Sequence, residues 1–182
     1  YIAKYRVDKE EGKIPNFVFM GTVQAVAVCA LVGVVTVVLY FFLDVIYATG
    51  LTAAELITAK RLYIFLAVGI VAHIFENLLN GVISGYNKFI FANGIKVIRL
   101  LVRILAVIVF LGIFKNSLVL VIIDLVCTSL FVLAELAYVL FIIKLKVRFT
   151  HWDKGIFAES FRYTMLLFLT SIVAQANSNF SN

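Results

Sequence analysis

Residues 73–103 read HIFENLLNGVISGYNKFIFANGIKVIRLLVR and place ionisable side chains inside two stretches that otherwise look like membrane-spanning helices. A charge near the middle of a bilayer costs about 2.5 to 3.5 kcal/mol even on the most lenient insertion scale. Glu76 and Arg103 therefore need ion-pair partners or a water-filled cavity. That need makes them the first candidates for a functional role.

Helical periodicity gathers the polar residues of this stretch onto two faces. At 100° per residue, one face of the first helix collects His73, Glu76, Asn77, Asn80 and Ser84. A narrower face of the second helix collects Lys96, Arg99 and Arg103. If the two helices reverse direction over residues 85–88, Glu76 and Arg103 reach similar depths. We therefore expect these two residues to form an ion pair across the hairpin.

The composition extends the membrane interpretation to the whole chain. Of its 182 residues, 64% are hydrophobic and only 14% are charged, against about 25% charged in soluble proteins. The mean hydropathy is +1.09. We predict an all-α, polytopic membrane helical bundle with four complete spans and part of a fifth. The expected spans are residues 17–43, 62–83, 89–114, 118–143 and, incomplete, 163–182.

Lysine and arginine are unevenly divided between the two sides of these spans. Most of them fall in residues 1–16, 84–88 and 144–162, which we therefore expect to be cytoplasmic loops. The opposite side has only Lys60, Arg61 and Lys115. The net charge of +6 is thus explained by membrane orientation, and no nucleic-acid partner is expected. Because the chain begins without Met and its last apolar run has no basic flank, we also expect an internal fragment of a larger protein.

Local signals refine this picture. Thr52 and Glu55 form a capping-box pattern, which predicts a helix that begins before the second apolar run. Asp153 is placed to cap a short interfacial helix. Gly81 and Gly85 have the small-residue spacing that permits close helix packing.

Further carboxylates lie in the fourth span. Asp124 and Glu135 are 11 residues apart, which returns them to nearly the same helix face. Asp124 could bind a coupling cation or serve in a structural pair, whereas for Glu135 the structural role is favoured. His73 could relay protons, but a hydrogen-bonded structural histidine is the commoner case.

Enzymatic and metal-binding motifs are missing from the sequence. It contains no HExxH, no GxSxG and no nucleotide-binding glycine fingerprint. Cys29 and Cys127 lie within apolar runs and are interpreted as small buried residues, not as a disulfide or metal pair. We therefore expect a protein that is not an enzyme, with no catalytic residue, no bound metal and no cofactor.

A family resemblance adds a function to this outline. The motifs that carry it occur in the order YIAKYR, FENLLNGVISGYNKF, IKVIRLLVR and FRYTMLLFLTSIVAQANSNF. Together with the carboxylate-bearing span, this order resembles the polysaccharide repeat-unit (Wzx-type) flippases of the multidrug/oligosaccharidyl-lipid/polysaccharide exporter superfamily. The resemblance implies that the chain forms part of the first six-helix bundle of such a transporter.

The resemblance implies a substrate and a setting. The substrate would be an oligosaccharide on undecaprenyl pyrophosphate, flipped across a bacterial or archaeal cell membrane by alternating access, with polysaccharide polymerase machinery as a further partner. Lys96, Arg99 and Arg103 would bind the pyrophosphate, since three cations on one face exceed the nearby carboxylates. Asn77 and Asn80 would bind sugar, and His73, Glu76 and Asp124 would serve in coupling or charge pairing.

Alternatives stay open at this point. Lys96 and Arg99 could instead extend toward lipid phosphates, with Arg103 held by Glu76 or Asp124 for folding alone. A cation-coupled multidrug exporter of the same superfamily would use Asp124 or Glu76 to take up H⁺ or Na⁺. A membrane scaffold without transport activity is the third alternative.

The predicted topology can be tested by cysteine labelling. Single cysteines at Lys9 and Lys154 should react with a membrane-impermeant thiol reagent only from the cytoplasmic side, because their loops are rich in Lys and Arg. A cysteine at Asn116 should react only from outside. A parent without Cys29 and Cys127 provides the background, and labelling of position 116 from the cytoplasm would overturn the topology.

Overall fold

The computed structural model describes residues 1–47, 50–114, 117–145, 147–149, 152–155, 157–159 and 161–162. Four long helices dominate it: α2 (Ile14–Ile46), α3 (Ala53–Gly85), α4 (Phe89–Phe114) and α5 (Ser117–Ala137), the last continued by a π-helical turn, η2 (Tyr138–Ile142). Each of the four is long and apolar enough to span a membrane. The predicted all-α, polytopic membrane bundle is confirmed. The expected fifth span, 163–182, and Asn116 lie outside the described residues.

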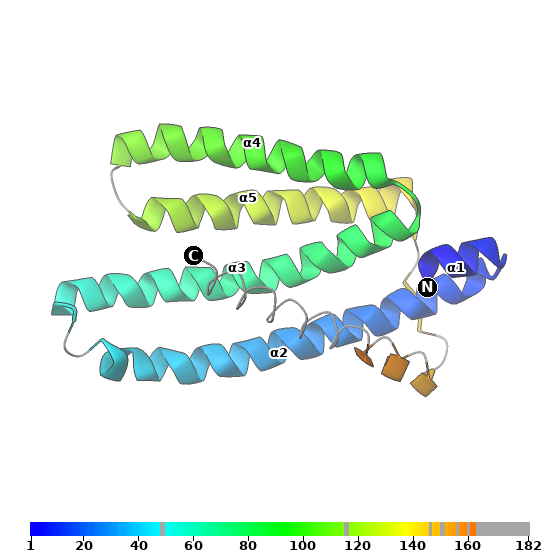
Figure 1. Cartoon of the computed structure of the whole chain (residues 1–182), viewed down its shortest axis with the longest axis horizontal. Coiled ribbons are helices and arrows are strands. Elements are labelled where there is room, and N and C mark those ends of the chain that lie inside the picture. Colours follow the sequence, from blue (N-terminus) through cyan, green and yellow to red (C-terminus); the bar gives the residue numbers. More distant parts are fainter. Residues whose placement is uncertain are drawn as a thin grey trace, which may run out of the picture.

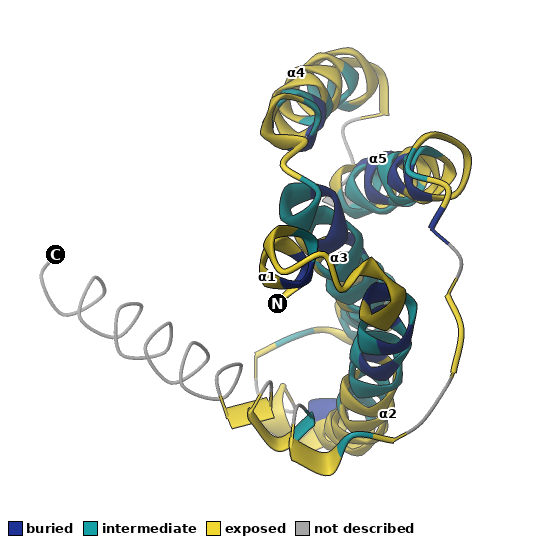
Figure 2. Ribbon diagram, turned by 90° about the vertical axis from the view of Figure 1, so that its right-hand side faces the viewer, coloured by how far each residue is buried: buried dark blue, intermediate teal, exposed yellow. Residues whose placement is uncertain are grey.

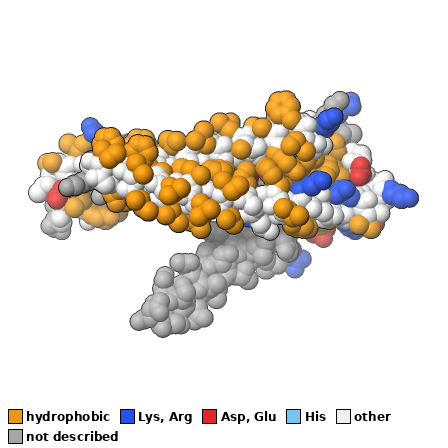
Figure 3. Space-filling view, turned by 90° about the horizontal axis from the view of Figure 1, so that it is seen from above, with side chains coloured by type: hydrophobic (Ala, Val, Ile, Leu, Met, Phe, Trp, Pro, Cys, Tyr) orange, Lys and Arg blue, Asp and Glu red, His pale blue; other side chains and the backbone are white. Residues whose placement is uncertain are grey.

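The four helices run alternately up and down (Figure 1). Helix α3 packs against α2 on one side and against α5 on the other, and α5 in turn packs against α4. Contacts between α3 and α4, which follow each other directly in sequence, are sparse (Figure 2). Large apolar side chains cover much of the outer surface, as a surface facing lipid requires (Figure 3).

The ends of α3 are set by two capping motifs. At its start, Glu55 N–H donates to Thr52 Oγ1 (3.4 Å) and Thr52 N–H donates to the Glu55 carboxylate (2.8 Å), which confirms the predicted capping box. At its end, Asn87 N–H donates to Ser84 O and Lys88 N–H donates to Ile83 O, with Asn87 at φ 59°. This is a Schellman motif with asparagine in the left-handed position. It makes the chain reverse within three residues and begin α4.

The segment 1–16 differs from the loop that we expected. It contains a short helix, α1 (Ile2–Val7), and a 3₁₀ turn, η1 (Glu11–Lys13). The reason is that the segment is amphipathic. Ile2 and Tyr5 are buried in a cluster with Val82 and Ile83 of α3, while the lysines of the segment are exposed. Polar composition alone did not reveal that two apolar residues three apart could dock this segment.

The basic segments gather at one end of the bundle. The N-terminal residues, the α3–α4 turn and the chain after η2 lie together at that end (Figure 1), where many Lys and Arg side chains appear in Figure 3. There Asp153 Oδ1 accepts from Gly155 N–H at 2.9 Å, as expected of a cap. The grouping agrees with the sequence, and which side of the membrane this end faces stays a prediction.

Gly85 lies where α1 docks against α3. A Cβ at Gly85 would stand 2.7 Å from Cβ of Ile2, whereas a Cβ at Gly81 would meet nothing within 4 Å. The predicted close approach is therefore present at Gly85 and missing at Gly81. Gly85→Ala should detach α1, because two carbon atoms cannot approach so closely.

Gly81→Ala is the matched control for this prediction. It lies on the same helix and should stabilise the protein slightly, because Ala exceeds Gly in helix propensity by about 1 kcal/mol. Thermal unfolding in detergent and proteolysis near Val7 would measure both effects. Equal behaviour of the two variants would show that the docking of α1 does not depend on Gly85.

Candidate functional site

A band of ionisable and polar side chains lies between α3, α4 and α5, and we call it the polar seam. Its members are His73, Glu76 and Asn80 on α3, Lys96, Arg99 and Arg103 on α4, and Asp124 and Glu135 on α5. Their positions fall within helices long enough to cross a membrane. In that setting each charge must be compensated by a partner.

Glu76 is the centre of the polar seam. Its side chain is only 8% exposed, and its Oε2 forms an ion pair with Nη1 of Arg99. His73, one turn earlier on the same helix, places Nδ1 2.9 Å from the same oxygen. The carboxylate is thus held by two partners. This contact agrees with a structural, hydrogen-bonded role for His73.

The expected ion pair between Glu76 and Arg103 is wrong. Arg103 instead contacts Asp124 on α5, with 3.1 Å between Nε and Oδ1. The reason is the centre of the reversal: the turn bends at Asn87, and Glu76 and Arg99 lie nearly equidistant from it along the chain. Arg103 lies one helical turn, about 6 Å, farther along α4.

The two ion pairs differ in how far the described chain covers them. In the inner pair, the side chains of Arg99 and Glu76 are 24% and 8% exposed. In the outer pair, those of Arg103 and Asp124 are 52% and 30% exposed. Leaving a buried charge without its partner costs far more than breaking an accessible pair. The inner pair is therefore suited to holding helices together and the outer pair to exchanging partners.

Glu135 is a buried carboxylate whose neighbours on other helices could not be predicted from the sequence. The residue is 1% exposed, and its Oε2 has no hydrogen-bond partner within the described part of the chain. Asn80 hydrogen-bonds to this carboxyl group, and Glu76, Arg99 and Lys96 are its charged neighbours. The available signal was that Glu135 shares a face of α5 with Asp124. Spacing along one helix could not indicate which other helix that face meets.

The remaining candidates are placed differently. Asn77 and Lys96 are exposed, and among the described residues Lys96 makes no direct ion pair. Asn80 donates to the backbone oxygen of Ala92 at the start of α4 (3.4 Å), so it bridges two helices. Within the described residues, the carboxyl groups of Glu76, Asp124 and Glu135 lie in the polar seam with the three basic side chains, and the expected excess of cations stays a prediction.

The described residues contain no group of three His, Cys, Asp or Glu side chains placed to hold a metal ion, and both cysteines are free thiols. Comparison of the chain with protein-family models, with curated proteins and with solved structures finds no match. Fold and seam together define a multi-span helical membrane protein with a charge network inside the bundle.

The pairing can be tested by comparing neutral variants. Arg99→Gln should lower the stability strongly, by roughly 3 to 5 kcal/mol as for broken buried pairs, because Glu76 stays buried and loses its cationic partner, with only the His73 contact left. Arg103→Gln should cost about 1 kcal/mol or less, since its pair is more accessible. Thermal unfolding of the purified variants in detergent measures both.

Charge swaps provide the control. The double variant Glu76→Arg, Arg99→Glu should recover part of the stability that either single variant loses. The double variant Glu76→Arg, Arg103→Glu should recover none. Recovery of stability in the second swap and not in the first would show that Glu76 pairs with Arg103 in the wild-type protein.

Proposed function

We propose that this chain works in a flippase that moves an oligosaccharide linked to undecaprenyl pyrophosphate across a bacterial or archaeal cell membrane. Two lines support the proposal: the resemblance of the YIAKYR, FENLLNGVISGYNKF and IKVIRLLVR segments to Wzx-type flippases, and the polar seam itself. A pyrophosphate headgroup that crosses a membrane needs cations to replace its hydration. A purely structural bundle has no such need.

The observation that carries the proposal is the outer ion pair together with Lys96. Arg103 and Asp124 are both accessible, and Lys96 lies two turns nearer the basic end without a direct partner among the described residues. The two cations therefore mark two depths along α4. A headgroup that enters from the basic end would meet Lys96 first and Arg103 next.

Partner exchange gives Arg103 a mechanism. A guanidinium carries five N–H donors in a rigid fork, and it binds phosphate in the same bidentate geometry as carboxylate. A phosphate group could therefore replace Asp124 on Arg103, and Asp124 could take the arginine back when the substrate leaves. Arg99 is excluded from this exchange because Glu76 holds it in the less accessible pair.

The asparagines take separate roles in this scheme. Asn80 is engaged with Ala92 and Glu135 and belongs to the framework. Asn77 is exposed one turn away and remains the neutral hydrogen-bonding group that could contact sugar hydroxyls. Polysaccharide polymerase machinery is a further partner that the resemblance implies.

Glu135 favours a second candidate, a cation-coupled exporter of the same superfamily. A carboxyl group that is 1% exposed and has an oxygen without a partner among the described residues is suited to taking up H⁺ or Na⁺. Such an exporter would depend on Glu135 more than on the outer cations. A scaffold without transport activity would depend on either group only for stability.

Substitution of Arg103 tests the proposed function. In cells whose native gene has been deleted, Arg103→Gln should insert and fold but restore less than a tenth of the surface polysaccharide, because the phosphate-binding fork is lost. Arg103→Lys should retain part of the activity, since the charge survives. Arg61→Gln, at the opposite end of the bundle, is the matched control and should restore it fully.

The same assay separates the candidates. Full restoration by a folded Arg103→Gln variant would contradict the flippase site. If Glu135→Gln then abolished export of a cationic dye from the cells, the cation-coupled exporter would replace the flippase as the proposed function. Loss of protein from the membrane in both variants, with normal transport by whatever remains, would favour the scaffold.

A further inference from the structure

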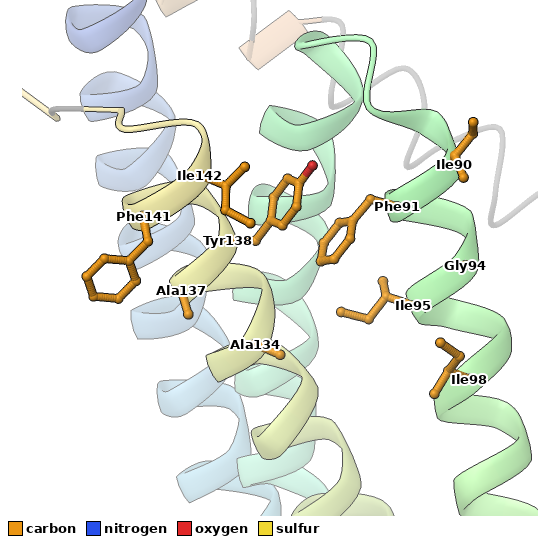
Figure 4. Close-up of a pocket in the computed structure, with 10 residues that line it drawn as sticks. All are labelled: Ile90, Phe91, Gly94, Ile95, Ile98, Ala134, Ala137, Tyr138, Phe141 and Ile142. Atoms are coloured by element: carbon orange, nitrogen blue, oxygen red, sulfur yellow. The ribbon is translucent and has the colours of Figure 1, made fainter.

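An apolar groove lies between α4 and α5 at the basic end of the bundle. It has a volume of about 730 Å³ and is open to the side. Figure 4 shows its two walls: Phe91, Ile95 and Ile98 come from α4, and Tyr138 and Phe141 from the chain that continues α5. The volume is within the range of small-molecule sites, about 300 to 1,000 Å³.

Small side chains and an irregular helix create this groove. Gly94 on one wall and Ala134 and Ala137 on the other leave the space that larger side chains would fill. The π-helical turn η2 supplies Tyr138, Phe141 and Ile142 to the lining. π-Helical turns are rare and occur frequently at functional sites.

A hollow of mixed polarity continues the groove toward the α3–α4 turn. This hollow, of about 460 Å³, is lined by Asn87 and Lys88 and shares Ile90, Phe91 and Tyr138 with the groove. The rings of Phe91 and Tyr138 stack at 3.6 Å where the two spaces meet. The combined site is therefore apolar along the membrane-spanning part and cationic at the end of the helices.

We infer that this combined site binds one anionic phospholipid, with an acyl chain along the groove and its phosphate beside Lys88 and Asn87. The argument is complementarity of charge and position: Lys88 follows α3 in the α3–α4 turn, at the same end as the other basic segments (Figure 1), where lipid headgroups would lie. An acyl chain gains little from leaving lipid for an equally apolar groove, so Lys88 should determine selectivity. This inference does not depend on the flippase proposal.

Filling the groove tests the acyl-chain part of the inference. A Cβ at Gly94 meets nothing within 4 Å, so Gly94→Leu can be accommodated while its side chain occupies the groove. Gly112→Leu is the matched control on the same helix, since Gly112 is equally open and lies outside the groove. Phosphatidylglycerol should raise the unfolding temperature of the wild type and of Gly112→Leu, and the rise should be lost in Gly94→Leu.

Lys88→Gln tests the headgroup part. The preference for phosphatidylglycerol over phosphatidylcholine, measured as the ratio of dissociation constants, should fall about fivefold, the effect of one basic residue near a membrane surface. An unchanged ratio would overturn the headgroup assignment. Stabilisation of Gly94→Leu equal to that of the wild type would overturn the groove as the lipid site.

A fluorescence measurement keeps the inference testable if Gly94→Leu fails to fold. The chain has a single tryptophan, so Trp152→Phe, Ile98→Trp carries one reporter in the groove. Brominated phosphatidylglycerol should quench it at lower lipid fractions than brominated phosphatidylcholine does. Equal quenching by both lipids would overturn the inference. So would protection of the tryptophan from quenching together with cross-linked dimers, because a second copy of the chain would then occupy the groove.

Discussion

The ion pair between Glu76 and Arg99 is the interaction on which the arrangement of α3 and α4 depends. These helices are joined by a three-residue turn, yet α4 packs mainly against α5. The pair, together with the Asn80 side-chain bond to Ala92, ties α3 directly to α4 below the turn. Such a pair inside a membrane needs matched depths. The left-handed Asn87 provides this match by making the reversal short and of fixed geometry.

The polar seam combines two kinds of electrostatic contact within one bundle. The inner pair is covered by the described chain, while the outer pair between Arg103 and Asp124 is accessible. A fixed pair keeps the framework rigid, and an accessible pair can exchange its partner for a ligand. Glu135 adds a buried carboxyl group within reach of both the asparagine and the basic residues. Each pair joins an arginine to a carboxylate, so the two pairs differ mainly in how far the rest of the described chain shields them from their surroundings.

Much of the fold was accessible to sequence reasoning because hydropathy and helix capping are local. The limits of α4 and the capping box of α3 follow from runs of apolar residues and from Thr52 and Glu55. Pairing between helices was less accessible, because one helical turn of difference in depth changes the partner. The reversal lies within the expected residues 85–88, but Arg103 is 16 residues from Asn87 and Glu76 only 11, so the two do not reach the same depth. The docking of Ile2 against Gly85 and the environment of Glu135 depend on packing between distant segments, which periodicity within one helix does not encode.

The position of the ion pairs along the chain has a consequence for membrane insertion during synthesis. Arg99 and its partner Glu76 belong to one helical hairpin, so the two charges can enter the bilayer together as a neutral unit as soon as α3 and α4 have been made. Arg103 differs, because its partner Asp124 is on α5 and is synthesised later. Until α5 arrives, Arg103 must extend to the membrane surface or remain in the water-filled insertion channel. The order of the residues along the chain thus sets the order in which the two charges can be neutralised.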